Sequence, residues 1–290
     1  GLDQVMEYIE DKWGDQEIDC AQATARRSEE LRARREDAKK VPSGKVFVLK
    51  IIIQDIEPAI HRTVTVTDTI TLHQLHEQVI APSVGWQQQY HAYAFRPTLW
   101  DNDGTTSNDW IGPKNSTAND ARLMMNFFGG GFVANSNKVE LRHLLLHKHD
   151  SLHYVYDLGD YWLHKIELVN VFTREEQAPF CILDGWGNCP PEDIGGPIKY
   201  CTFINGLLEQ SQGSAKWPPS PDWRGPSFSH EEWIDGCTEI MNSCFIGKGN
   251  VPGIRFDPAK YDMEFAQNRL DTAVREKVSK TKKSDGFIQS

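Results

Sequence analysis

The chain has 290 residues, a formal net charge of -10, a mean hydropathy of -0.53 and 39% hydrophobic residues. The acidic balance argues against a general nucleic-acid binder, because affinity for phosphate comes from clustered Lys and Arg. No apolar run approaches the ~20 residues of a membrane-spanning helix, and the N-terminus lacks the basic-then-apolar pattern of a secretory signal. Six cysteines at irregular spacing are too few for a disulfide scaffold. We therefore expect an intracellular protein, cytoplasmic or nuclear, that has no membrane partner.

Both ends of the chain are charged and poor in aliphatic residues. Residues 1–44 predict a charged arm, either an exposed helix or a linker, because their helix formers show no continuous apolar stripe. Residues 275–290 predict a basic, disordered tail. Lys and Arg gather at both ends and could contact nucleic acid, although such tails are more often simply solvated. The domain itself is expected over residues 45–274.

The domain begins with two strand-forming segments and a helix. Residues 45–54 and 60–66 are β-rich, and the short connection between them predicts an antiparallel pair. Thr71 and Gln74 have the spacing of a capping box. Apolar residues then recur with helical spacing until Pro82 and Gly85, which predicts a helix with one buried face.

The remaining segments complete an α+β pattern. Residues 90–96 predict a strand, and residues 97–138 predict a long surface insertion with one short helix at 121–127. A short helix is expected near 139–146, followed by a hairpin with strands at 151–157 and 161–171. An irregular loop is expected at 173–198, and three helices are expected at 198–209, 230–245 and 258–272. The predicted fold is therefore α+β, a mixed or antiparallel sheet with an embedded helix and C-terminal helices.

The densest group of ionisable side chains surrounds the predicted hairpin turn. Asp and Gly favour tight turns, so a purely structural role is one interpretation of Asp157 and Asp160. Side chains two residues apart on a strand share a face, so Asp160, Trp162 and His164 should point the same way, with Asp157 across the turn. Together these groups could bind a divalent cation or a polar ligand.

A second acidic segment, C-P-P-E-D-I-G-G, follows at residues 189–196. Its carboxylates could cap the next helix or lie beside the hairpin. His91 could face the hairpin from its own strand, whereas His76 is expected to be a satisfied core histidine. We assign no catalytic residue. The candidate binding residues are His91, Asp157, Asp160, Trp162, His164, Glu192 and Asp193.

The cysteines do not have the spacing of a zinc site. Seven residues separate Cys181 from Cys189, whereas structural zinc sites bring ligands in closely spaced pairs. A core thiol or a redox pair is the alternative for these two, and Cys237 and Cys244 have the spacing of packing residues on a helix. We expect no cofactor and no tightly bound zinc, and at most a weak Mg²⁺ or Mn²⁺ site with oxygen ligands.

The two central motifs resemble those of the plasmid pRiA4b open-reading-frame-3-like family. Residues 154–164 resemble its Y-x-Y-D-F-G-D-x-W-x-H motif, and residues 189–196 resemble C-P-P-E-D-x-G-G. The chain departs at Leu158, where the family has Phe, and at Ile194, where a Cys is often found, which argues further against a metal site. The resemblance implies an α+β domain and a link to mobile elements, because members also occur as passenger proteins of insertion sequences. It implies no catalytic mechanism.

Two functions are consistent with this sequence. The first is a non-catalytic module that binds a protein or nucleic acid through its basic termini and Trp-rich loops, since nine Trp, many of them in polar segments, are typical of an interface. The second is a divalent-metal-dependent hydrolase that uses Asp157, Asp160, His164, Glu192 and Asp193. We favour the module, and a non-enzyme, because each catalytic candidate also has a structural explanation.

Overall fold

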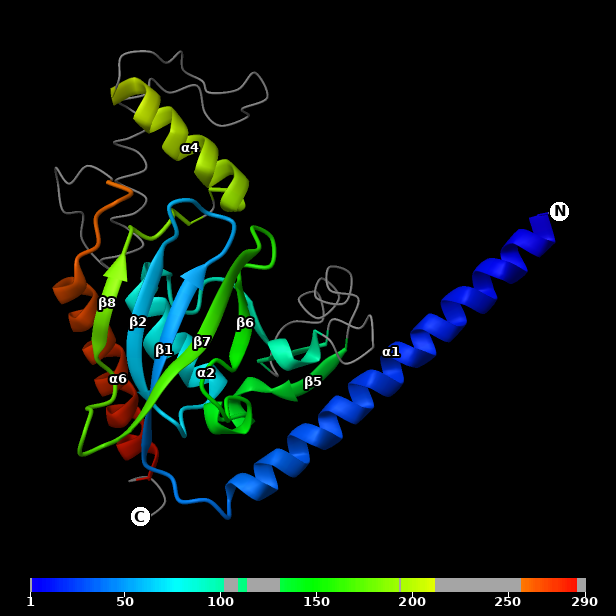
Figure 1. Ribbon diagram of the computed structural model, residues 1–290, viewed down its shortest axis with the longest axis horizontal. Helices are drawn as coiled ribbons and strands as arrows, with labels where there is room; N and C mark the ends of the chain where they lie inside the picture. The colour runs from blue at the N-terminus through cyan, green and yellow to red at the C-terminus, as the bar shows by residue number, and fades with distance from the viewer. Residues whose placement is uncertain (1, 102–108, 114–130, 193, 212–256, 286–290) are drawn as a thin grey trace.

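The computed structural model describes residues 2–101, 109–113, 131–192, 194–211 and 257–285 (Figure 1). One eight-stranded sheet has the strand order β5-β4-β3-β6-β7-β1-β2-β8. The strands are β1 (Lys45–Ile53), β2 (His61–Thr67), β3 (Tyr93–Pro97), β4 (Trp110–Gly112), β5 (Phe132–Asn135), β6 (Ser151–Tyr156), β7 (Trp162–Thr173) and β8 (Ile182–Trp186). Every neighbouring pair is antiparallel except β4 and β5, which makes the sheet mixed, so the predicted α+β class is confirmed.

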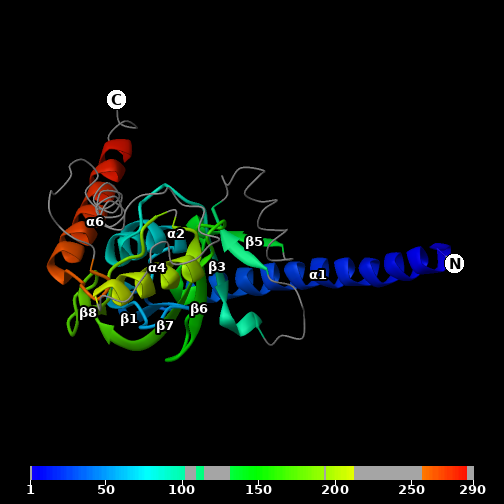
Figure 2. The same cartoon turned by 90° about the horizontal axis from the view of Figure 1, so that it is seen from above.

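The described residues form four longer helical segments. They are α1 (Leu2–Ala38), α2 (Leu72–Gln74) with the π-helix η1 (Leu75–Gly85), α4 (Gly196–Ser211) and α6 (Met263–Asp285). The described part of the chain also contains the short 3-10 helices η2 (Thr98–Trp100), η3 (Ser136–Lys138) and η4 (Leu141–His143). Both views place α2 and α6 on the same side of the sheet, whereas α1 lies beside β5 and then extends away from the body (Figures 1 and 2). No helix of the described residues combines the length and apolar character needed to cross a membrane.

Local sequence signals account for the embedded helix. Thr71 caps it as predicted: its hydroxyl accepts a hydrogen bond from the Gln74 amide, and the Gln74 side chain accepts one from the Thr71 amide. The helix continues through Pro82 with π-helical turns and ends at Gly85, where φ is 127°. Proline has no N–H to donate in a regular α-helix, so an irregular helix is the expected consequence.

The core lies between the helices and the face of the sheet that they cover. Along β7 alternate side chains are buried, beginning with Trp162 and continuing through Ile166 and Leu168. On β1 the same face buries Leu49 and Ile51. Each large apolar side chain that is fully buried contributes about 1.5–3 kcal/mol, which fixes which face of each central strand points inward.

The structure corrects several predicted segments. The surface insertion at 97–138 contributes β4 and β5 to the sheet, and Asp109 and Ile111 there are fully buried. The loop predicted at 173–198 contains β8, and α6 continues to Asp285, into the segment expected to be a disordered tail. The predicted helices at 121–127 and 230–245, the latter with Cys237 and Cys244, lie outside the described residues.

The N-terminal arm is helical and is not merely exposed. Ala23, Arg27 and Leu31 of α1 are 1–3% exposed, each four residues after the last. The sequence lacked an apolar stripe because the central residue of this buried row is an arginine, whose charge is compensated by a residue far along the chain.

Candidate functional site

The hairpin between β6 and β7 forms the centre of the candidate site. The two strands pair antiparallel from Ser151 opposite Glu167 to Tyr156 opposite Trp162, which confirms the predicted hairpin. In the turn, Asp157 has φ 55°, its carboxylate accepts a hydrogen bond from the Gly159 amide at 2.9 Å, and its carbonyl accepts one from the Tyr161 amide at 2.7 Å. Asp157 therefore holds the turn with one carboxylate oxygen, as aspartate commonly does in tight turns.

The second oxygen of Asp157 faces an imidazole that a second carboxylate also approaches. His91 Nε2 lies 3.5 Å from Asp157 Oδ2 and 3.7 Å from Glu192 Oε2. The other oxygen of Glu192 accepts hydrogen bonds from the Gln87 amide at 2.8 Å and from the Tyr156 hydroxyl at 3.0 Å. Burial and the negative charge of Glu192 together raise the pKa of Tyr156 far above its usual value. The structure thus brings His91, Asp157 and Glu192 into one cluster.

The 189–196 loop is fastened to the tip of the same hairpin. The Gly195 amide donates a hydrogen bond to Asp160 Oδ2 at 2.8 Å. Gly196 has φ 86°, and a Cβ atom there would lie 2.5 Å from the carbonyl oxygen of Asp160. Glycine is therefore required at Gly196 by its backbone conformation and by this close approach. Asp193, which precedes these glycines in the loop, lies outside the described residues.

Trp162 and His164 do not share this surface, contrary to the expectation from strand periodicity. Both are 0% exposed. Trp86 Nε1 donates to His164 Nε2 at 3.0 Å, and His164 Nδ1 donates to the Trp162 carbonyl at 2.8 Å. Burial lowers the pKa of His164 to about 4. The alternation of faces begins only at Trp162, whereas Asp160 belongs to the turn, so the two-residue spacing did not extend to it.

His76 is a buried histidine with hydrogen-bond partners, as predicted. Its Nδ1 lies 2.8 Å from the Tyr154 hydroxyl, and its ring stacks on Tyr93 with centroids 3.8 Å apart. Burial lowers the pKa of His76. This imidazole fills the core beneath the candidate site and is not available to a ligand.

One buried cation behind the site was missed by the sequence reasoning. Arg62 is 1% exposed and donates five hydrogen bonds to main-chain carbonyls, those of His61, Ser83, Val84, Trp186 and Gly187. Its guanidinium lies 3.6 Å from the centre of the Tyr261 ring, and burial lowers its pKa to about 10. One indication of this was present in the sequence: Arg62 occupies a position that alternates in step with the apolar residues of β2.

The described residues hold no arrangement that suits a metal ion. Cys181 and Cys189 are not joined in a disulfide bond; the first is half-buried and the second is buried. Within the described ranges no three His, Cys, Asp or Glu side chains gather so that they could coordinate a metal. The carboxylates of the cluster instead accept hydrogen bonds from the main chain.

Comparison with known proteins places this arrangement in a family. The chain is 30% identical over 184 residues to the uncharacterized protein y4hQ of Sinorhizobium fredii (strain NBRC 101917 / NGR234), an alignment that covers 61% of this chain and 83% of that protein. It is similar to the crystal structure of the protein of unknown function MM3350 from Methanosarcina mazei Go1, with a TM-score of 0.51, 26% identity and coverage of 77% of this chain and 97% of that chain. Residues 45–234 match the family described as plasmid pRiA4b ORF-3-like protein. The chain belongs to this family.

Proposed function

We propose that this protein is a non-catalytic, intracellular module that binds a protein partner through the hairpin tip and the 189–196 loop attached to it. The proposal rests on the hydrogen bonds that the acidic side chains at the hairpin tip make within the protein. Asp157, Asp160 and Glu192 each accept a hydrogen bond from a main-chain amide, and so they stabilise the local backbone structure. The proposal keeps the link to mobile elements that the family resemblance implies.

These contacts give less support to the alternative, a divalent-metal-dependent hydrolase. A general base must reach the proton that it abstracts, but His164 is fully buried and both of its ring nitrogens make hydrogen bonds inside the protein. A metal ligand must present its lone pairs to the ion. One oxygen of Asp157 and one of Glu192 are already engaged with amides, and the remaining oxygens face His91.

The surface chemistry favours a protein partner over nucleic acid. Basic residues of α1 pair with acidic neighbours in the same helix, as in Arg32 with Glu29 and Lys39 with Glu36, so they form no purely cationic surface. Near the acidic hairpin tip, Tyr90 is 49% exposed and packs on His91 at 4.3 Å between ring centroids. An exposed aromatic ring near an acidic turn suits a partner segment that carries Arg or Lys.

The proposal is tested with a defined cationic probe. A ¹⁵N-labelled chain is titrated with N-acetyl-arginine amide, with N-acetyl-glutamine amide as the uncharged control. We expect saturable shifts at Tyr90 and His91 for the arginine probe alone, and their loss in the Asp157→Asn/Asp160→Asn variant, which keeps one acceptor oxygen on each side chain and removes its charge. Absence of a localised response would contradict the proposal. A Mn²⁺-dependent rise in melting temperature that the same double substitution abolishes would support the hydrolase instead.

A further inference from the structure

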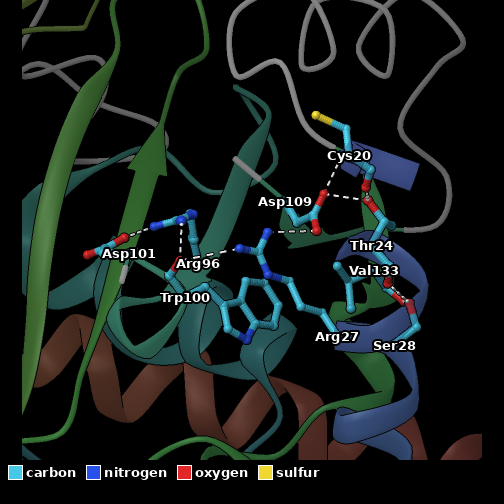
Figure 3. A network of polar contacts seen from close by, with 10 residues as sticks. Cys20, Thr24, Arg27, Ser28, Arg96, Trp100, Asp101, Asp109 and Val133 are labelled. Atoms are coloured by element: carbon cyan, nitrogen blue, oxygen red, sulfur yellow. Dashed lines mark hydrogen bonds and ion pairs between the residues drawn. The ribbon is translucent and has the colours of Figure 1, made fainter. Parts of the chain in front are cut away.

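Helix α1 is attached to the domain by an ion pair that is completely buried (Figure 3). Arg27 Nη1 lies 2.8 Å from Asp109 Oδ2, and both side chains are 0% exposed. The same guanidinium donates a hydrogen bond to the Trp100 carbonyl at 3.3 Å and lies 5.2 Å from the centre of the Trp100 ring. A buried charge is tolerated only when its partner is well placed, so this groove is specific for a helix that carries a cation at this position.

Asp109 also recognises the neighbouring turn of α1. Its Oδ1 accepts a hydrogen bond from the Thr24 hydroxyl at 2.6 Å and another from the Gly131 amide at 2.7 Å. A Cβ atom on Gly131 would lie 2.6 Å from Thr24 Oγ1, so the lack of a side chain there admits the helix. One turn further along, the Ser28 hydroxyl donates a hydrogen bond to the Val133 carbonyl on the edge strand β5 at 3.3 Å. The groove therefore forms hydrogen bonds with polar side chains on successive turns of α1.

The groove and its occupant are separable parts of the chain. Helix α1 lies before residue 45, where the match to the family begins. It is anchored by three buried positions in one row, Ala23, Arg27 and Leu31, which is the i, i+4, i+8 pattern of a helix bound in a groove. Residues 39–44 connect α1 to β1, and six residues span at most about 20 Å.

We propose that the groove formed by Trp100, Asp109, Gly131 and Val133 is a helix-binding site that accepts α1 from a second copy of this chain, so that two copies exchange their α1 helices. A second copy is the partner that supplies the required side chains in register, because it carries the same Thr24, Arg27 and Ser28. Such an exchange preserves every contact of the groove and closes with twofold symmetry. The short connection gives α1 an effective concentration on the order of mM at its own groove, so the exchanged form requires high protein concentration or a weakened internal contact. This inference is independent of the function proposed above.

Complementary charge reversals test the exchange with full-length chains. An Arg27→Asp chain presents an acidic helix to its own Asp109, and an Asp109→Arg chain presents a basic groove to its own Arg27. Neither can dock its own helix, but after mutual exchange both grooves hold an opposite charge. We expect two monomers with rapid amide hydrogen exchange in residues 20–38 when the chains are separate. The equimolar mixture should give a heterodimer of twice the mass with protected helices, measured by light scattering and hydrogen-exchange mass spectrometry.

The double variant Arg27→Asp/Asp109→Arg is the matched control and should recover a monomer with a protected α1. If the control recovers but the mixture remains two monomers with unprotected helices, α1 docks only on its own domain and the proposal is wrong. If the control does not recover, the ion pair is not the recognition element, which overturns the proposal as well.

Should a charge-reversed chain fail to fold, a labelled peptide of residues 20–40 is titrated into the full-length Arg27→Ala chain. Saturable binding that is weakened about tenfold or more by Arg27→Ala in the peptide is expected, because the buried Asp109 would then lack its cation. No saturable binding of the unmodified peptide would contradict the proposal.

Discussion

Replacing His164 by Leu should remove a pH-dependent part of the stability of this protein. At pH 7 the neutral imidazole joins Trp86 Nε1 to the Trp162 carbonyl at 3.0 and 2.8 Å. Leucine fills a similar volume and leaves both groups buried without this partner, and an unpaired buried group costs about 1–3 kcal/mol. We therefore expect the His164→Leu variant to be about 2–6 kcal/mol less stable at pH 7.

The difference between the two proteins should shrink in acid. Burial lowers the pKa of His164 from 6.5 to about 4. Between these values the unfolded chain binds more protons than the folded one, so the contribution of His164 is complete above pH 6.5 and is lost as the pH falls through about 4. A change of about 2.5 pKa units corresponds to about 3 kcal/mol. The difference in stability between the wild-type protein and the variant should therefore fall by nearly this amount as the pH approaches about 4.

Urea unfolding at intervals between pH 7 and pH 4.5 measures both effects. The other buried histidines, such as His143, whose pKa burial lowers to about 4, contribute equally to both proteins and cancel in the difference. His147 has an 82% exposed side chain, so the His147→Leu control should change stability by less than about 0.5 kcal/mol at every pH. A difference between wild type and His164→Leu that stays constant with pH would refute the view that burial keeps His164 neutral.

Three further substitutions test other contacts of the fold by chemical denaturation. Arg62→Met keeps the length of the side chain but removes five hydrogen bonds to carbonyls, so we expect a loss above about 4 kcal/mol, and a loss below about 1 kcal/mol would disprove its role. Gly196→Ala places a Cβ atom 2.5 Å from the Asp160 carbonyl oxygen at a position that also has a positive φ. It should therefore lower the stability more than Gly44→Ala, because Gly44 has φ 128° but no atom near its Cβ position. Equal losses of stability would show that the contact with Asp160 is unimportant. Thr71→Ala should cost about 1 kcal/mol, because the capping hydrogen bond to the Gln74 amide is lost, and no change in stability would mean that solvent replaces the cap.

Features that depend on neighbouring residues were predictable from the sequence. The hairpin follows from two strand-forming runs around a turn that contains Asp157 and Gly159, and the capping box follows from Thr71 and Gln74. In each case the hydrogen bonds join residues within a few positions of each other, so the pattern of the chain contains the information. The motif pair that resembles the family likewise identified two segments that the structure holds in contact through Asp160 and Gly195.

The sequence by itself therefore determined the α+β class, the hairpin, the embedded helix and the segments that form the candidate site. Tertiary packing decided where the side chains of those segments lie: the helices cover one face of β7, so Trp162 and His164 are in the core, whereas His91 lies near Asp157 and Glu192 at the hairpin tip. It also decided the docking of α1, because the charge of the buried Arg27 is compensated by Asp109, 82 positions away. The periodicity of a segment indicates its preferred secondary structure, whereas its burial and the compensation of its charges depend on which distant segment packs against it.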